Sequence, residues 1–380
     1  MLKLKYSKKK EGVLLENNFQ FYLPTRIIQG PDCLINHSSY MKRLGKKALI
    51  VTGINSSKLN GSLDDVITAL EKENIRYKIF DQIDDNPTID IIQQAFDENE
   101  REGISFIIGL GKGSPIDAAK AIGVLFRNRG ISGREAFNMK NLRSIPIVAV
   151  PTTAGTGSEV TPYSIIADQN LRTKKDFGQE SFPKLAYLDP RYIYAADFTS
   201  LLHNAFDAFS HLVEGYLNNK ATVITDVIAE KGLAMFASLH QAFLDQYLTP
   251  DQMDQLLMAS AMGGMVISQT GTSLPHALGY VLTYEKGIPH GFATAAIYKG
   301  YLTHYKDSDK LNRMLNILNF DSTEKMMDYI DQIVDYNLEL NDNEIREYTR
   351  NILNNQGKLK NHPERITRTQ IAEMYQKAIK

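Results

Sequence analysis

The feature that most constrains this chain is a regular alternation of short apolar runs with helical patterns, which fills the first half and then stops. KALIVTG at 47–53 and ISFIIGLG at 104–111 are typical of buried strands, and segments such as SLDDVITALEKENI at 62–75 have the spacing of amphipathic helices. Strands and helices that alternate in this way form βαβ units, in which helices cover both faces of a parallel sheet. Ligands of such sheets bind beyond the carboxyl ends of the strands.

The second half carries almost no strand pattern. After KLAYLDPRYIY at 184–194 the chain is a series of long helical patterns, including 221–244 and 253–269. Small residues in the latter helix suit close packing in a helical core: Ala259, Ala261, Gly263 and Gly264. A chain of 380 residues is long for one core, so we predict two domains that meet near Pro190.

Composition excludes several classes of function. The net charge of −1 implies no attraction to nucleic acid or to anionic membranes, and no apolar run is long enough to cross a bilayer. Five lysines occur in the first ten residues, but EGVLLENNFQF after them lacks the apolar core of a signal peptide, so we expect a cytoplasmic protein. The single cysteine, Cys33, excludes an intramolecular disulfide and a thiolate-rich metal site.

A carboxylate and a histidine share one helical face in FDAFSHLVEGY at 206–216. Asp207 and His211 are four residues apart, and such a pair is usually solvated unless further ligands converge on it. His276 and His290, each preceded by proline, complete a set of three nitrogens and one oxygen. That set suits Fe(II), Zn(II) or a related divalent ion and leaves room for a substrate oxygen.

The surroundings of this set can also be predicted. We expect His276 at the end of the 253–269 helix and His290 at the start of the next one. Glu214 either orients His211 or caps a packing contact, since histidine ligands are commonly held by hydrogen bonds from outside the metal. His203, four residues before Asp207, is expected at the surface or outside the ligand set.

Two loops at predicted strand ends are rich in glycine or hydroxyl groups. GLGKGSPIDAAKA at 109–121 has glycines at 109, 111 and 113, and the helix after it offers free N–H groups and a positive dipole end. Its spacing matches neither the usual dinucleotide fingerprint nor a P-loop. PTTAGTGSEVT at 151–161 adds five hydroxyl side chains at a second strand end. Two such loops on one sheet favour a nucleotide site.

Four motifs occur in order: GLGKGSPIDAAKAIG, PTTAGTGSEVTPYSI, DAFSHLVEGYL and TGTSLPHALGYVLTYEKGIPHG. With them the chain resembles the iron-containing (group III) alcohol dehydrogenases, from FYLPTRIIQGPDCL near residue 21 to the C-terminal helices, and most of all the NADP-linked 1,3-propanediol and butanol dehydrogenases. The resemblance implies a dehydroquinate synthase-like architecture. An α/β dinucleotide-binding domain with a Rossmann-like parallel sheet would occupy 1–190, and an all-helical metal-binding domain would occupy 191–380.

The resemblance also implies roles for residues. Asp207, His211, His276 and His290 would hold Fe(II), with Zn(II) as a possible substitute, and catalysis would proceed through the metal. Predicted dinucleotide contacts are Asn86 on the adenosine side, Gly111, Gly113, Ser114 and Asp117 at the pyrophosphate and ribose, Thr152, Thr153 and Thr156 at the phosphates and nicotinamide, and Lys175 at the ribose. Relatives associate, often as dimers, so a homo-oligomer is expected.

Three positions depart from the family pattern. Lys112 replaces a usual glycine and would strain the backbone if the position needs a positive φ. Tyr280 stands where many members carry a histidine, so it is a candidate proton donor or a packing residue. Gly53 stands where NAD-using members tend to have aspartate.

The last departure predicts the cofactor. An acidic side chain at position 53 would accept the ribose 2′-OH and repel a 2′-phosphate. Gly53 cannot do this, whereas Ser56, Ser57 and Lys58 offer hydrogen bonds and a positive charge. We therefore predict NADP(H) in preference to NAD(H).

These features leave three functions open. The first is hydride transfer between NADP(H) and a short-chain primary alcohol or aldehyde such as butanol or 1,3-propanediol, with glycerol or 1,2-diol oxidation as a variant. The second is a dehydroquinate synthase-like lyase acting on a phosphorylated sugar, which would need several Lys and Arg around the metal. The metal motifs instead have mainly apolar neighbours: Phe209, Leu274, Leu278 and Val281. The third is a catalytically silent metal- and nucleotide-binding protein.

Overall fold

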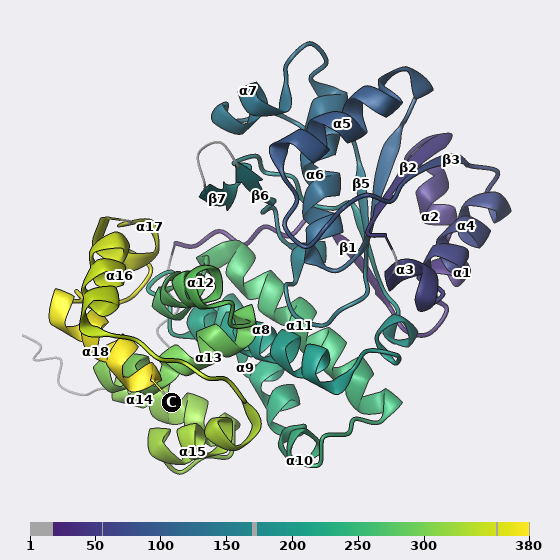
Figure 1. The fold of residues 1–380 in the computed structure, drawn as a ribbon. Helices are drawn as coiled ribbons and strands as arrows, with labels where there is room; N and C mark the ends of the chain where they lie inside the picture. Colours follow the sequence, from purple (N-terminus) through teal and green to yellow (C-terminus); the bar gives the residue numbers. More distant parts are fainter. Residues whose placement is uncertain (1–17, 55, 169–172, 355, 380) are drawn as a thin grey trace, which may run out of the picture.

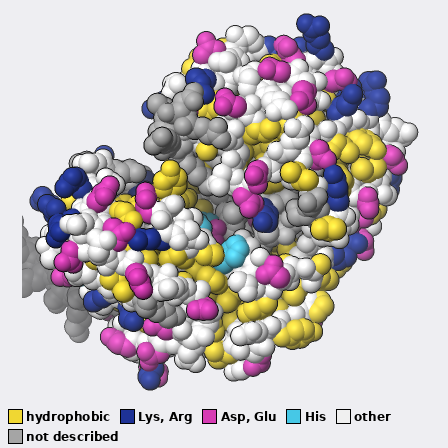
Figure 2. Space-filling model, in the orientation of Figure 1, with side chains coloured by type: hydrophobic (Ala, Val, Ile, Leu, Met, Phe, Trp, Pro, Cys, Tyr) yellow, Lys and Arg dark blue, Asp and Glu magenta, His cyan; other side chains and the backbone are white. Residues whose placement is uncertain are grey.

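The protein consists of a layered α/β part and a helical part (Figure 1). On the face drawn in Figure 2 the surface is hollowed where the two parts meet. The computed structural model describes residues 18–54, 56–168, 173–354 and 356–379. None of the helices in these ranges is long and apolar enough to cross a membrane.

The α/β part is built on a six-stranded sheet, in the order β1-β8-β5-β4-β2-β3, whose strand pairs are all parallel. Its strands are β1 (Arg26–Gln29), β2 (Lys47–Thr52), β3 (Arg76–Phe80), β4 (Phe106–Gly111), β5 (Ile147–Pro151) and β8 (Leu185–Leu188). The predicted parallel sheet is confirmed.

Helices cover both faces of this sheet, as the sequence predicts. Successive residues of β4 point to opposite faces, so that Ile107 joins a core with Ile122 on one side and Ile108 joins a core with Val66 on the other. The helices and 3-10 turns of this part are α1 (Cys33–Asn36), α2 (Ser39–Lys42), α3 (Ser56–Leu59), α4 (Ser62–Lys72), α5 (Ile89–Asn99), η1 (Glu100–Glu102), α6 (Gly113–Arg127), α7 (Gly133–Asn138) and η2 (Ser158–Val160).

A short antiparallel hairpin is among the elements that the sequence did not predict. It pairs β6 (Ile165–Asp168) with β7 (Thr173–Asp176) beside α6. The β7 sequence TKKD lacks any apolar alternation, so its strand conformation comes from pairing with β6 and not from a pattern of its own.

Helices make up the remainder of the described chain, with α8 in their centre against α9, α11, α12 and α13. Their bounds are η3 (Pro190–Ile193), α8 (Phe198–Tyr216), α9 (Val223–Ala237), α10 (His240–Leu244), α11 (Pro250–Thr270), α12 (Leu274–Lys286), α13 (His290–Tyr301), η4 (Leu302–His304), α14 (Ser308–Ile317), α15 (Thr323–Ile333), α16 (Asp342–Asn354), α17 (Gln356–Leu359) and α18 (Arg368–Ala378). The boundary between domains at 190/191 stays a prediction.

Two helical predictions need correction. The single helix expected over 221–244 is divided into α9 and α10, at a point where no glycine or proline marks a break. His276 does not lie at the end of α11. Gly271, at φ 71°, ends that helix, and His276 belongs to the first turn of α12, where Pro275 is well suited. His290 opens α13, as predicted.

Small residues bring the two parts into close contact. A Cβ on Gly157 would lie 2.5 Å from the Cα of Gly264, so the hydroxyl-rich loop after β5 rests directly on the backbone of α11. On the same helix, a Cβ on Gly263 would lie 3.0 Å from the Cβ of His211. The predicted close packing of α11 therefore places the end of the sheet beside α8.

Candidate active site

Helix α8 presents the first two residues of the site. Its first turn is capped by Asp197, whose side chain accepts a hydrogen bond from the Ser200 N–H, and it is buried from Ala205 to Tyr216. Asp207 and His211 are one turn apart on this helix and are both buried. The sequence did not decide whether the helical face with Asp207 and His211 points to solvent or holds a ligand. In the structure this face points into the protein.

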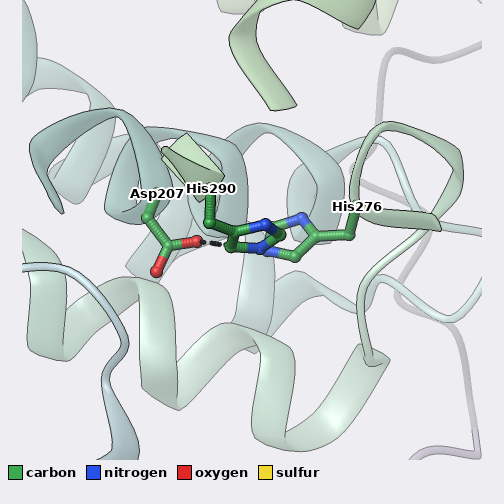
Figure 3. Close-up of side chains that lie close together, drawn as sticks. All are labelled: Asp207, His276 and His290. Carbon is green, nitrogen blue, oxygen red and sulfur yellow. Dashed lines mark ion pairs between the residues drawn. The ribbon is translucent and has the colours of Figure 1, made fainter. Parts of the chain in front are cut away.

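Helices α12 and α13 bring two more histidines to the same point. The Nε2 atoms of His276, His211 and His290 lie 3.3, 3.6 and 3.7 Å from Oδ1 of Asp207. Figure 3 shows His276 and His290 approaching the carboxylate of Asp207, and the candidate ligand atoms of these three residues lie within 4.8 Å of one another. Ligands at the usual distances from a tetrahedral ion are about 3.4 Å apart, so the three distances to Asp207 fit a metal site. His211 approaches Asp207 but is not one of the three residues whose ligand atoms all lie within 4.8 Å of one another.

The chemical state of three of these groups also suits a metal, whereas His276 differs, because burial would lower its pKa but the carboxylates of Glu214 and Asp207 outweigh burial and raise it. Asp207 Oδ1 and Nε2 of His276 and His290 are buried and have no hydrogen-bond partner among the described residues. Burial lowers the pKa of His211 to about 4 and that of His290 to about 3, so both rings are neutral at pH 7 and keep a free lone pair. Burial would raise the pKa of Asp207, but the adjacent histidines outweigh it and hold the carboxylate ionised. Neutral imidazole and ionised carboxylate are the forms that bind metal.

Glu214 holds His276 through the ring nitrogen that faces away from Asp207. Its Oε1 lies 2.5 Å from Nδ1 of His276, and its Oε2 accepts a hydrogen bond from the Ser273 N–H. The sequence left open whether Glu214 orients His211 or caps a packing contact, and the structure pairs it with His276 instead. A fully buried carboxylate on Nδ1 fixes the tautomer that leaves Nε2 free for a metal.

The aromatic residue at position 280 lies directly on the cluster. The Tyr280 ring stacks on His290 with centroids 4.5 Å apart, and it also approaches His276 edge-on. His203, by contrast, is half-buried and packs edge-on against Phe292. Histidine side chains, in cyan, are visible at the bottom of the hollow between the two parts (Figure 2).

The two loops of the α/β part meet at the ends of β4 and β5. Gly111 has φ 138°, a conformation that favours glycine, whereas Lys112 has φ −62° and is unstrained. A Cβ on Gly113, the first residue of α6, would lie 2.7 Å from Cγ2 of Thr156. The start of α6 and the hydroxyl-rich loop are thus in contact, as a shared phosphate site requires.

Several predicted cofactor residues are already engaged with the protein. Asp117 accepts hydrogen bonds from Oγ of Ser158 at 2.5 Å and from the N–H of Ile165 at 2.9 Å, which fixes the second loop to α6. Ser114 donates from its hydroxyl to the Asp85 carbonyl, beside the exposed Asn86. Thr152 and Thr153 line a small cavity that faces α8.

Two of the residues predicted to bind the 2′-phosphate, Ser57 and Lys58, already have partners within the protein. The buried Ser57 hydroxyl is 2.7 Å from that of Thr52, and the Lys58 ammonium is paired with Asp81 at 2.7 Å. The Ser56 side chain lies outside the described part of the structure. Lys175 is on β7, where its ammonium lies 4.3 Å from the centre of the Phe137 ring.

Comparison with known proteins identifies the family. The family model of iron-containing alcohol dehydrogenases matches residues 24–190, and the C-terminal model of the same family matches 202–379. The chain belongs to the iron-containing alcohol dehydrogenase family. The predicted family, fold class and enzyme class are confirmed.

Individual relatives agree with this assignment. The chain is 30% identical over 323 residues to sulfoacetaldehyde reductase of Bilophila wadsworthia, which is 83% of each protein. It is 30% identical over 280 residues to alcohol dehydrogenase 4 of Schizosaccharomyces pombe, which is 73% of this chain and 66% of that protein. The solved structure of an iron-containing alcohol dehydrogenase from Thermotoga maritima has a TM-score of 0.86 and 34% identity, over 95% of this chain and 99% of that one.

The structure adds one side chain to the site of this alcohol dehydrogenase that the sequence did not indicate, and it gives a partner to another. Lys358, on the short helix α17, has its ammonium 4.9 Å from the centre of the Tyr280 ring. Lys112, directly before α6, pairs at 3.5 Å with Asp85 in the segment between β3 and α5. Nothing in the local sequence marks Lys358, because its proximity to the site depends on how the C-terminal helices return to α12.

Proposed function

We propose that this protein reduces short, unbranched aldehydes to primary alcohols with NADPH, and that Asp207, His211, His276 and His290 hold the required divalent ion. The observation that carries the proposal is the approach of three histidine Nε2 atoms to Oδ1 of Asp207 at 3.3 to 3.7 Å. Fe(II) is the proposed ion, and Zn(II) is compatible with the same ligands. When bound, such an ion supplies Lewis acidity at the substrate oxygen.

The rest of the proposal concerns what the protein's own residues do. The N-terminus of α6 and the loop with Thr152, Thr153 and Thr156 bind the dinucleotide phosphates, and contact between Gly157 and Gly264 sets that loop against the helical part. Tyr280 stabilises the orientation of His290 through ring stacking. The hydride chemistry belongs to the cofactor, and the protein positions it.

The preference for NADP(H) is supported by the absence of a carboxylate at Gly53. Lys58 is the proposed partner of the 2′-phosphate, and it would exchange its present contact with Asp81 for the phosphate. The half-exposed state of both side chains makes this exchange feasible.

The substrate class is supported by the relatives, whose names, alcohol dehydrogenase and sulfoacetaldehyde reductase, both refer to the alcohol–aldehyde couple. Membership of an oxidoreductase family favours this chemistry over the lyase interpretation. A homo-oligomer, in particular a dimer, and a cytoplasmic location belong to the same proposal.

The test is oxidation of NADPH and of NADH with butyraldehyde, by protein loaded anaerobically with Fe(II) and, in parallel, with Zn(II). We expect the fastest turnover with NADPH and Fe(II), and none in protein stripped by a chelator. Glycerol and NADP+ in a parallel assay measure the diol variant. Absence of turnover with every pairing of metal and cofactor would reject the proposed function.

A further inference from the structure

Lys358 occupies an unusual place beside the proposed metal site. It lies on α17, which packs against α12 and α16 (Figure 1). Its ammonium donates a hydrogen bond to Oγ1 of Thr272, just before α12, and faces the ring of Tyr280 at 4.9 Å. Since Tyr280 stacks on His290, the Tyr280 ring lies between this cation and the proposed metal ligands.

The charge of Lys358 has no counter-ion within ion-pairing distance among the described residues. Lys286 on the neighbouring helix α12 shows the usual arrangement, with its ammonium 2.6 Å from Glu344. Lys358 instead contacts a neutral hydroxyl and a ring, so none of its three N–H donors meets a carboxylate among the described residues. A partly buried ammonium without a counter-ion is costly, and a neutral side chain would contact Thr272 without that cost.

The surroundings lower the pKa of Lys358 but leave it above neutrality. Burial lowers its pKa to about 8, and the carboxylates of Glu214 and Asp207 act in the opposite direction. The lysine is therefore mostly protonated at pH 7. Tyr280 is 38% exposed, so the ring that separates Lys358 from the histidines also faces open space.

We propose that Lys358 forms an anion subsite, which selects short aldehydes that carry a carboxylate or sulfonate at the end remote from the reacting carbonyl. The proposal rests on the proposed function, because it assumes that the carbonyl is held at the metal cluster. The ammonium then meets the charged end of the substrate across the face of Tyr280.

Two aldehydes of equal chain length test the anion subsite. Succinic semialdehyde and butyraldehyde differ in whether a carboxylate or a methyl group ends the chain. We expect the wild type to prefer the former, and the ratio of their kcat/KM values to fall about tenfold or more in Lys358→Met, chiefly through KM. Lys358→Arg should retain the preference. Lys360→Met, which removes an exposed charge two residues away, should leave the ratio unchanged.

The outcomes separate the subsite from a structural role and from failure of the proposed function. The subsite would be overturned if the ratio of kcat/KM values for the two aldehydes were equal in the wild type and in Lys358→Met, or if the variant lost activity with both aldehydes together. If the Met variant does not fold, Lys358→Gln replaces it in the same comparison. If the wild type reduces neither aldehyde, the proposed function fails. Calorimetry with 4-hydroxybutyrate and 1-butanol on Zn(II)-loaded protein then decides the subsite by itself: tighter binding of the anion that Lys358→Met abolishes supports it, and equal binding rejects it.

Discussion

The metal cluster, meaning the four side chains proposed to hold one ion, and the two nucleotide loops at 109–121 and 151–161 differ in whether their polar groups are free to bind a ligand. In the cluster, side chains from α8, α12 and α13 converge, and buried atoms of Asp207, His276 and His290 lack hydrogen-bond partners among the described residues. In the loops, the side chains of Asp117 and Ser114 are already hydrogen-bonded within the protein. A ligand of the loops must therefore rely largely on backbone N–H groups and on the threonine hydroxyls.

This difference determines which substitutions matter. A metal site made of convergent side chains depends on the identity of each residue, because replacing one of these side chains removes a ligand atom. A site made of backbone depends on conformation and space, so it responds to an added Cβ at Gly113 or Gly157 more than to a changed polar group. We expect effects to decrease from the cluster, through its supports, to the loops.

Replacing His276 should give the largest effect. His276→Ala removes an Nε2 atom that lies 3.3 Å from Asp207 Oδ1, and with it one of the four proposed ligands. We expect loss of bound metal and a fall in kcat/KM of about a thousandfold or more. Metal content after gel filtration and NADPH oxidation with butyraldehyde are the measurements.

The matched control is His37→Ala, which removes an exposed histidine in the α/β part that stacks on Tyr40. Metal content and turnover should remain as in the wild type. If His276→Ala keeps its full metal content, the proposed ligand set is wrong, and the convergence on Asp207 has another cause.

Removing the support of His276 should have an intermediate effect. Glu214→Gln keeps the size of the side chain, but an amide N–H directed at Nδ1 favours the tautomer in which Nε2 carries the proton and cannot bind metal. Carboxylates in this position contribute about 10- to 100-fold in metal affinity or activity. Competition with a chromogenic chelator measures the affinity directly.

Glu344→Gln is the control for this change, because it neutralises a partly exposed carboxylate that pairs with Lys286 on α12. It should leave metal affinity as in the wild type. An unchanged affinity in Glu214→Gln would show that the 2.5 Å contact serves packing and not ligand orientation.

Sequence alone predicted the parts of the molecule that depend on local spacing. The four-residue interval between Asp207 and His211 placed both on one helical face, and the strand pattern gave the parallel sheet. The convergence of His276 and His290 on them was inferred through the family resemblance, because α12 and α13 reach α8 only after the chain has folded.

Other features depend on contacts between segments that are distant in the chain. The Glu214 carboxylate binds His276 and not the nearer His211, because α12 begins after the turn at Gly271. The strain considered for Lys112 required a positive φ, which the neighbouring Gly111 has instead. Lys358 has no local signal at all, since its position over Tyr280 follows from the path of the C-terminal helices.

The smallest predicted effect concerns the cofactor and tests whether the two regions are separable. Gly53→Asp introduces a carboxylate at the end of β2 that would accept the ribose 2′-OH and repel a 2′-phosphate. A Cβ at this position would be 3.2 Å from the Ile83 carbonyl oxygen, so Gly53→Ala measures the steric cost alone. Relative to Gly53→Ala, the ratio of kcat/KM for NADPH to that for NADH should fall about tenfold in Gly53→Asp.

Metal content should be unchanged in both variants, because no proposed metal ligand comes from the α/β part. An equal ratio in the two variants would mean that position 53 does not contact the ribose, and the argument for NADP(H) would then fail while the metal cluster stood.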